Sequence, residues 1–202
     1  MNTAELIDEY LIAMRRMKLD HDVEALKRHS VPMRAIATVC PAPVTITVDR
    51  SGELYQPHEA GRAAWVFPVC CIDPENPDAI EAPDPLAVVA SGAVIDLLAF
   101  SPLAPRRWAL RRGVATVVGA IPPQFLDPDA VVVHDDVTDW LRAGCSGIVL
   151  LTRSQTEAAR VLRQCQAIEV NNASHAADLL RLLQPVTKWP TVRVRTALRS
   201  AA

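Results

Sequence analysis

Apolar positions near the start of the chain recur at helical spacing. Leu6, Tyr10 and Met14 are each four residues apart, which predicts an amphipathic helix of about four turns. Asn2 and Glu5 stand three residues apart at its beginning and form the pattern of a capping pair. The chain is therefore expected to open with a helix that buries one face.

The helical period is interrupted at residues 19–22, and a shorter helix is expected to follow. Asp22 is the predicted N-cap of this second helix, because its carboxylate can accept a hydrogen bond from a backbone N–H of the first turn. Val23 and Leu26 would form the buried side. A helical N-terminus is the resulting prediction for the first part of the chain.

From residue 44 the pattern changes to alternation. Residues 44–48 are β-branched at every position and predict a strand, and the turn residues 49–52 connect it to a hairpin partner at 54–55. Residues 63–72 predict a third strand. Pro68 lies inside it, which indicates an edge strand or a bulge because proline cannot donate to a ladder.

A proline-rich acidic segment follows at residues 73–85. It contains four prolines and five acids, so it can form neither a helix nor a central strand. We interpret it as a linker loop. The predicted organisation is an N-terminal helical and β subdomain at 1–72, the linker at 73–85, and an α/β domain at 86–202.

Short apolar strands then alternate with helical patterns. The predicted strands are 86–90, 131–133, 147–151, 168–170 and 191–195, whereas 93–100 fits a helix or a strand and 106–121 is ambiguous. Strands separated by helices imply right-handed crossovers and a parallel sheet. The predicted fold class is α/β, with a helical N-terminus, a small β element and a C-terminal, mainly parallel α/β unit.

The charge is segregated along the chain although its formal net value is only -2. Residues 49–100 carry nine acids and two bases, residues 101–125 carry four arginines and no acid, and residues 140–202 carry nine bases and three acids. The small total excludes a protein that coats nucleic acid or membrane through its overall field. The separated patches fit either complementary surfaces within the fold or a homodimer, or an anion site on the basic side.

The five cysteines show no paired spacing, so a secreted disulfide framework is not expected. Vicinal Cys70 and Cys71 lie in an apolar run and indicate buried structural thiols. No signal peptide is evident, and no apolar run approaches the roughly 20 residues of a membrane helix. The expected location is the cytoplasm, and no membrane partner is expected.

Polar side chains follow three of the predicted parallel strands. Because ligands collect beyond the carboxyl ends of such strands, these loops are the expected place of a site. Three of the side chains, Asp136, Ser154 and Ser174, also suit helix N-caps, and capping alone would explain them. Asn172 is the alternative to Ser174 as the residue that starts the last helix. The ligand-binding candidates are His134, Asp135, Asp136, Arg153, Ser154, Asn171, Ser174 and His175.

A second candidate is an arginine-rich segment around one tryptophan. Guanidinium groups next to an indole can bind phosphates and a stacked base. Alternatively, the tryptophan packs inward while the arginines are solvated or meet the acidic 73–85 segment. The anion or nucleic-acid candidates are Arg106, Arg107, Trp108, Arg111 and Arg112.

Several common site motifs do not occur in the sequence. There is no dinucleotide-binding or P-loop glycine pattern, no Cys-x-x-Cys, no His-Glu-x-x-His and no Gly-x-Ser-x-Gly. Neither a cofactor nor a metal site is therefore predicted.

Two resemblances concern the second half of the chain. Residues 88–100, 114–120 and 131–136 resemble the first strand and helix, the second strand and the acidic strand end of a Toprim domain, the divalent-metal module of primases and topoisomerases. Ser91 stands where that family has a glutamate, and adjacent Asp135 and Asp136 replace its Asp-x-Asp pair. The resemblance over residues 86–136 therefore implies the fold and a phosphate- or nucleotide-handling role, and leaves metal chemistry unsupported.

The second resemblance is to uncharacterised proteins carried by phages and prophages. It rests on the stretches 108–113 and 139–144 and on the strand that follows at 147–151. This similarity implies no activity.

Three hypotheses for function follow. The first is a non-catalytic accessory or interaction protein of phage-type nucleic-acid metabolism, motivated by the missing catalytic motifs and the segregated charge. The second is a phosphate- or nucleotide-handling enzyme with its site at the carboxyl edge of the sheet. The third is a structural homo-oligomer. Expected partners are another protein or a second copy of the chain, and nucleic acid through local basic patches.

Overall fold

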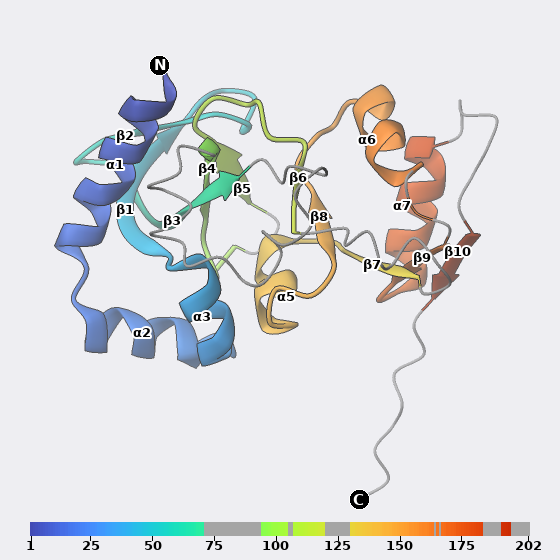
Figure 1. Ribbon diagram of the computed structural model, residues 1–202, viewed down its shortest axis with the longest axis horizontal. Helices are drawn as coiled ribbons and strands as arrows, with labels where there is room; N and C mark the ends of the chain where they lie inside the picture. The colour runs from blue at the N-terminus through green and yellow to red at the C-terminus, as the bar shows by residue number, and fades with distance from the viewer. Residues whose placement is uncertain are drawn as a thin grey trace, which may run out of the picture.

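A computed structural model of the protein contains two β-sheets, one antiparallel and one mainly parallel, with helices around them (Figure 1). The structure describes residues 1–70, 94–104, 107–119, 130–163, 165, 167–183 and 191–194. These elements bear out the predicted α/β class, with helices at the N-terminus and a mainly parallel unit at the C-terminus.

Three helices open the chain: α1 (Thr3–Arg16), α2 (Leu19–Arg28) and α3 (Met33–Val39). The predicted capping pair of α1 is confirmed. The backbone N–H of Glu5 donates to Asn2 Oδ1 at 2.9 Å, and the backbone N–H of Asn2 donates to Glu5 Oε2 at 2.8 Å. These two bonds satisfy donors that a helix N-terminus otherwise leaves without an intrahelical partner.

The start of α2 differs from the prediction. The helix begins at Leu19, so Asp22 lies within its first turn and is not the N-cap. The N-cap is Lys18, whose side chain makes no capping bond. The carboxylate of Asp22 instead reaches back and accepts the backbone N–H of Lys18 at 2.7 Å. An acidic side chain inside the first turn thus supplies the acceptor that a capping residue would normally provide.

The first sheet is antiparallel throughout, in the order β2-β1-β3-β4-β5. Its strands are β1 (Ala42–Val48), β2 (Tyr55–Pro57), β3 (Arg62–Cys70), β4 (Val94–Phe100) and β5 (Trp108–Leu110). The predicted hairpin of β1 and β2 is confirmed, and residues 94–100 form a strand. The sheet combines strands from both sides of residues 73–85, and both that segment and the predicted strand 86–90 lie outside the described residues.

Pro68 lies in β3, which is a central strand and not the predicted edge strand. The position is tolerated because β1 pairs with β3 only as far as Ala42 opposite Val66. Beyond that point β4 is the one described strand that pairs with β3, so one side of the backbone needs no donor to a ladder. The register also shifts between Val69 and Cys70, so the alternative prediction of a bulge is confirmed close to the proline.

The second sheet has the order β10-β9-β7-β8-β6, and only the short edge strand β6 is antiparallel. Its strands are β6 (Val117–Val118), β7 (Val131–His134), β8 (Ile148–Leu150), β9 (Ala167–Val170) and β10 (Thr191–Val194). The connecting helices are α5 (Val137–Arg142), α6 (Gln155–Leu162) and α7 (Ala173–Leu183). Among the described residues, no helix is long and apolar enough to cross a membrane.

Successive residues of β8 point to opposite faces of the second sheet. Ile148 belongs to the cluster formed with α6 and α7, whereas Val149 belongs to the cluster shared with α5 and the first sheet. Helix α5 therefore covers the face toward the first sheet, while α6 and α7 lie together on the other face (Figure 1).

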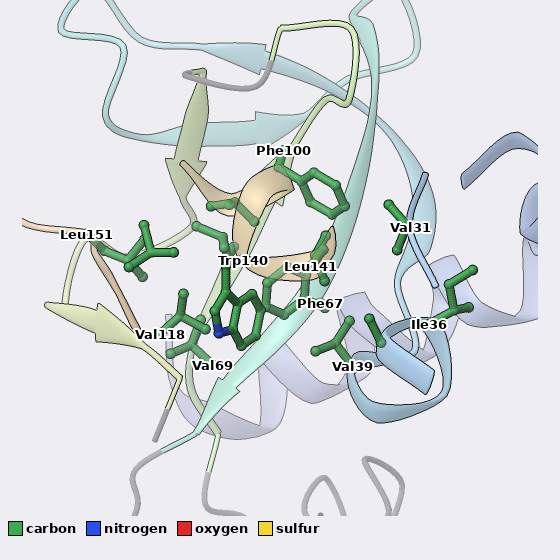
Figure 2. Close-up of a cluster of buried hydrophobic side chains, with 14 of the residues drawn as sticks. Val31, Ile36, Val39, Phe67, Val69, Phe100, Val118, Trp140, Leu141 and Leu151 are labelled. Atoms are coloured by element: carbon green, nitrogen blue, oxygen red, sulfur yellow. The ribbon is translucent and has the colours of Figure 1, made fainter. Parts of the chain in front are cut away.

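The two sheets share one hydrophobic cluster, shown in Figure 2. Phe67 of β3 lies between two aromatic partners, with its ring centroid 5.8 Å from that of Phe100 and 6.0 Å from that of Trp140. The Trp140 indole N–H donates to the carbonyl of Gly147 at 3.1 Å, so the polar end of this buried ring is satisfied. Because the two sheets pack against each other through this cluster, their facing surfaces are held in place. The candidate site lies between these surfaces.

Candidate functional site

The central strands β7 and β9 mark the point where the second sheet changes its direction of winding. From β7 the chain passes through α5 to β8 on one side, and from β8 it crosses back through α6 to β9 on the other side of β7. The connections after β7 and β9 therefore diverge and leave a crevice at the carboxyl ends, where open α/β sheets bind ligands. His134 ends β7, and Asn171 follows β9.

A cavity of about 1440 Å³ lies between this edge and the first sheet. Four of the strand-end candidates line it, and two residues of the arginine-rich segment line it from the first sheet. Arginines of the β1–β2 turn and of the start of β3 add to the same wall. The six sequence candidates in the lining are His134, Asp135, Arg153, His175, Arg107 and Trp108.

His134 is buried at the end of β7, and one of its ring nitrogens is fixed by the backbone. Its Nε2 lies 2.8 Å from the carbonyl oxygen of Ser146. Because a carbonyl can only accept, Nε2 carries the proton in the neutral ring and Nδ1 holds the lone pair. The backbone thus sets both the orientation and the tautomer of the imidazole.

His175 is buried in the first turn of α7 and reaches the same cavity. Its backbone N–H donates to Asn172 Oδ1 at 2.8 Å. Asn172 therefore caps the helix, as one of the two predicted starting residues. This cap sets the first turn and with it the position of the imidazole on the cavity wall.

The neighbouring carboxylates Asp135 and Asp136 differ in their surroundings. Asp135 is partly exposed and lines the cavity. Asp136 is buried and acts as the N-cap of α5, where its Oδ1 accepts the backbone N–H of Asp139 at 2.8 Å. Burial raises the pKa of Asp136 above the ordinary value for an aspartate. Asp136 has a structural role, and Asp135 is the carboxylate that faces the cavity.

The remaining strand-end candidates do not line the cavity. Ser154 is the N-cap of α6, and its Oγ accepts the backbone N–H of Glu157 at 3.4 Å. Asn171 and Ser174 are exposed, one before and one after Asn172, the residue that caps α7. Capping, the simpler interpretation of this set, therefore accounts for Ser154.

The arginine-rich segment is divided between two surroundings, and Arg106 lies outside the described residues. Arg107 and Trp108 line the cavity. Arg111 turns away and places its Nε 2.8 Å from Glu9 Oε2, while Arg112 donates to the carbonyl of Ile95 at 3.4 Å. Among the described residues of this segment, Arg107 and Trp108 are the ones that contribute to the site.

The sequence did not point to two further cations on the cavity wall. Arg50 lies in the β1–β2 turn and Arg62 at the start of β3. Together with Arg107 they are exposed and form no ion pair with any residue that the structure describes. The turn residues 49–52 had indicated a hairpin only, because no local pattern shows which distant surface a turn will face.

The aspartate beside these cations is occupied by the turn itself. Asp49 accepts hydrogen bonds from Ser51 Oγ at 2.7 Å and from the backbone N–H groups of Glu53 and Leu54. The hydrogen bond from Ser51 lowers the pKa of Asp49 below its usual value. Because this carboxylate is held by the turn, it does not neutralise Arg50 by a direct ion pair.

No group of three or more His, Cys, Asp or Glu side chains that could hold a metal ion occurs within the described part of the chain. The cavity offers guanidinium groups, two imidazoles, one indole and the carboxylate of Asp135, while Asp49 and Asp178 are engaged by Ser51 and Arg181. Guanidinium groups pair well with phosphate, and an indole face accepts a stacked base.

Comparisons with protein families, with curated proteins and with solved structures found no match to this chain.

Proposed function

We propose that the protein binds a phosphate-bearing ligand with an aromatic base in the cavity between its two sheets. The observation that carries this proposal is the joint lining of one cavity by the strand-end histidines and by Arg107 and Trp108. A site at the winding reversal of a parallel sheet is where such ligands bind in other α/β proteins.

The basic side chains provide the affinity for phosphate. Arg50, Arg62 and Arg107 are exposed and are not used by ion pairs within the described residues. A guanidinium presents several N–H donors in a fixed plane and can hold two phosphate oxygens at once. Five arginines and three aspartates line the cavity in all, so the local charge favours an anion.

Trp108 provides the contact for a base. Its side chain is partly buried and packs against the shared hydrophobic cluster, which holds the ring in place. A ring face turned toward the cavity would be available for stacking, a contact worth about 1–3 kcal/mol per base in single-stranded complexes. Phosphate and base would thus be bound by neighbouring residues of β5 and the loop before it.

A binding role fits an accessory protein of nucleic-acid metabolism, the first hypothesis from the sequence. We propose a cytoplasmic setting for it, which the free thiols of Cys145 and Cys165 would suit. Burial raises the pKa of these thiols to about 12 and about 11, so both stay protonated at neutral pH.

The test is calorimetric titration of the full chain with pyrophosphate, adenosine diphosphate and a short oligonucleotide. We expect at least one base-bearing probe to bind more tightly than pyrophosphate, and Arg107→Ala to weaken that binding by about tenfold, the equivalent of one charge-assisted hydrogen bond. The matched control is Arg160→Ala, because Arg160 lies on α6 with Glu157 and does not line the cavity. Absence of binding by every probe, or equal losses in both variants, would refute the proposal.

A second candidate function is acid–base chemistry on the bound ligand. It is favoured by one observation, the presence of His134, His175 and Asp135 in the lining of the same cavity. This candidate would be supported if the wild type released inorganic phosphate or shorter oligonucleotides. His134→Gln should lose that activity, and Arg160→Ala should keep it.

A further inference from the structure

We infer that the ligand of the cavity is a single-stranded nucleic acid that contacts the protein through several phosphates, and not a mononucleotide. This inference rests on the proposed function and specifies its ligand. Four properties of the cavity support it: its size, the distribution of its cations, the absence of a phosphate cradle and the position of Trp108.

The cavity is larger than a small molecule needs. Pockets for small ligands usually have volumes of roughly 300–1,000 Å³, whereas this cavity has about 1440 Å³. Its lining extends from the β1–β2 turn, across the starts of β3 and β5, to Arg181 and Leu182 of α7. One nucleotide would contact only part of this surface, whereas a strand of several nucleotides could follow it.

The cations are distributed along the cavity and come from separate elements. Arg50 lies in a turn, Arg62 begins β3, Arg107 precedes β5, Arg153 follows β8 and Arg181 lies in α7. Two of them have acidic neighbours: Arg153 lies 3.4 Å from Glu53, and Arg181 lies 2.8 Å from Asp178. Spaced cations along a groove are the arrangement by which proteins follow a phosphodiester backbone.

The described residues of the lining form no loop that would concentrate donors on one pyrophosphate. Nucleotide sites of α/β proteins commonly use a glycine-rich loop in which several backbone N–H groups converge. The chain has seven glycines without a cluster, and among the described residues Gly52 and Gly61 are the glycines that line the cavity. Gly61 is required by packing, because a Cβ there would lie 2.3 Å from the carbonyl oxygen of Ile46.

Trp108 favours an unpaired base. The residue lies in β5, at the end of the first sheet, and is held by the shared hydrophobic cluster. A duplex keeps its bases stacked on one another, so it cannot offer a base face to a ring fixed in a cavity wall. Stacking on an indole accepts any base, which predicts weak sequence preference.

The experiment measures fluorescence anisotropy of a labelled thymidine dodecanucleotide bound to the full chain. Its competitors are thymidine monophosphate, a thymidine tetranucleotide, a uridine dodecanucleotide and a duplex of the same length. We expect affinity to rise by at least about tenfold from the mononucleotide to the dodecanucleotide, and to fall linearly with salt on a double-logarithmic plot, with a slope of roughly −0.7 per contacted phosphate.

Variants identify the groups responsible. Arg62→Ala and Arg107→Ala should each lower affinity and reduce the salt slope by about 0.7, as expected for the loss of one phosphate contact. Trp108→Leu should lower affinity by about fivefold or more, and Trp108→Phe should retain most of it because phenylalanine still stacks. Arg160→Ala is the control for charge and should change neither affinity nor slope.

The outcomes separate this inference from the proposed function. Equal affinity for the mononucleotide and the dodecanucleotide, or for the duplex and the single strand, overturns the inference while binding in the cavity stands. Absence of binding by every nucleotide and oligonucleotide overturns both. Tight binding of the single strands supports the inference, and the ratio between the uridine and thymidine strands identifies RNA or DNA as the source.

Discussion

Arg153, which lines the cavity, pairs with Glu53 of the β1–β2 connection, with its Nε 3.4 Å from Glu53 Oε1. Glu53 follows the β1–β2 turn, and Arg153 follows β8. Because both side chains are largely exposed, the pair contributes little to stability. The pair does engage a guanidinium that would otherwise be available to phosphate.

Glu53→Gln should therefore raise the affinity for phosphate-bearing ligands. The expected gain is up to about fivefold, equivalent to an exposed ion pair of at most about 1 kcal/mol. The free energy of unfolding should change by less than about 0.5 kcal/mol. Titration with the dodecanucleotide and urea denaturation measure the two quantities.

The control for this variant is Glu157→Gln, which removes the partner of Arg160 on α6, away from the cavity lining. It should leave the affinity unchanged. A decrease in affinity in Glu53→Gln would show that the glutamate itself helps to hold the ligand.

Arg111 and Arg107 belong to one arginine-rich segment but should respond differently to mutation. The guanidinium of Arg111 pairs with Glu9 at 2.8 Å, and the two side chains are only 21% and 20% exposed. Tyr55 donates to the same carboxylate at 3.2 Å, and its ring centroid lies 5.9 Å from the Arg111 guanidinium carbon. Arg111 therefore stabilises the contact between α1 and the first sheet.

Arg111→Ala should lower the free energy of unfolding by about 2 kcal/mol, because the Glu9 carboxylate would remain partly buried without its cation. Ligand affinity, measured well below the unfolding midpoint, should stay within about twofold of the wild type. Arg107→Ala should show the opposite pattern, with reduced affinity and unchanged stability. Loss of affinity in both variants would place the whole segment in the site.

The features that the sequence predicted well depend on contacts between near neighbours. The hydrogen bonds between Asn2 and Glu5 and between Asp136 and Asp139 span three residues. Such bonds follow from the local order of side chains, so a single sequence is sufficient to find them. The alternation of residues 44–48 likewise predicted β1, because a pleated strand exposes every second residue.

The features that the sequence missed depend on distant contacts. Residues 93–100 fitted either a helix or a strand, and the choice was decided by pairing of β4 with β3 across the sequence interval 71–93. Arg50 and Arg62 reach the cavity because the shared hydrophobic cluster brings the first sheet against the second. Neither the pairing of strands distant in sequence nor the packing of one sheet against the other produces a local pattern in a single sequence.

Asp96 is a further residue whose role the sequence did not reveal. It lies in the apolar strand β4 and is fully buried. Its Oδ1 accepts the backbone N–H groups of Leu97 and Arg112, both within 2.9 Å, and its Oδ2 accepts those of Val114 and Ala115. One carboxylate thus holds the loop between β5 and β6.

Asp96→Asn should lower the free energy of unfolding by about 3 kcal/mol. The amide group of asparagine can replace only one acceptor oxygen, so buried N–H donors would face another donor, at a cost of about 1–3 kcal/mol each. The midpoint of urea denaturation should fall while its slope stays constant. Asp178→Asn, an exposed substitution on α7, is the control and should change stability by less than about 0.5 kcal/mol.

Asp136 should make stability depend on pH in a direction that is unusual for an aspartate. Burial raises its pKa in the folded protein above the unfolded value of about 3.9. The folded state therefore binds this proton more tightly, so the stabilising contribution is complete below about pH 4 and is lost as pH rises through the folded pKa. Asp136→Asn keeps an acceptor oxygen for the N-cap and removes the titration.

The free energy of unfolding of Asp136→Asn, relative to the wild type, should consequently increase between about pH 4 and about pH 7. At the upper end the variant should be at least as stable as the wild type. Asp136→Ala removes the cap and should cost about 1 kcal/mol at both ends of the range. Urea denaturation across the pH series measures these differences, and a relative stability of Asp136→Asn that falls with rising pH would show that the carboxylate is stabilised in its ionised form by the first turn of α5.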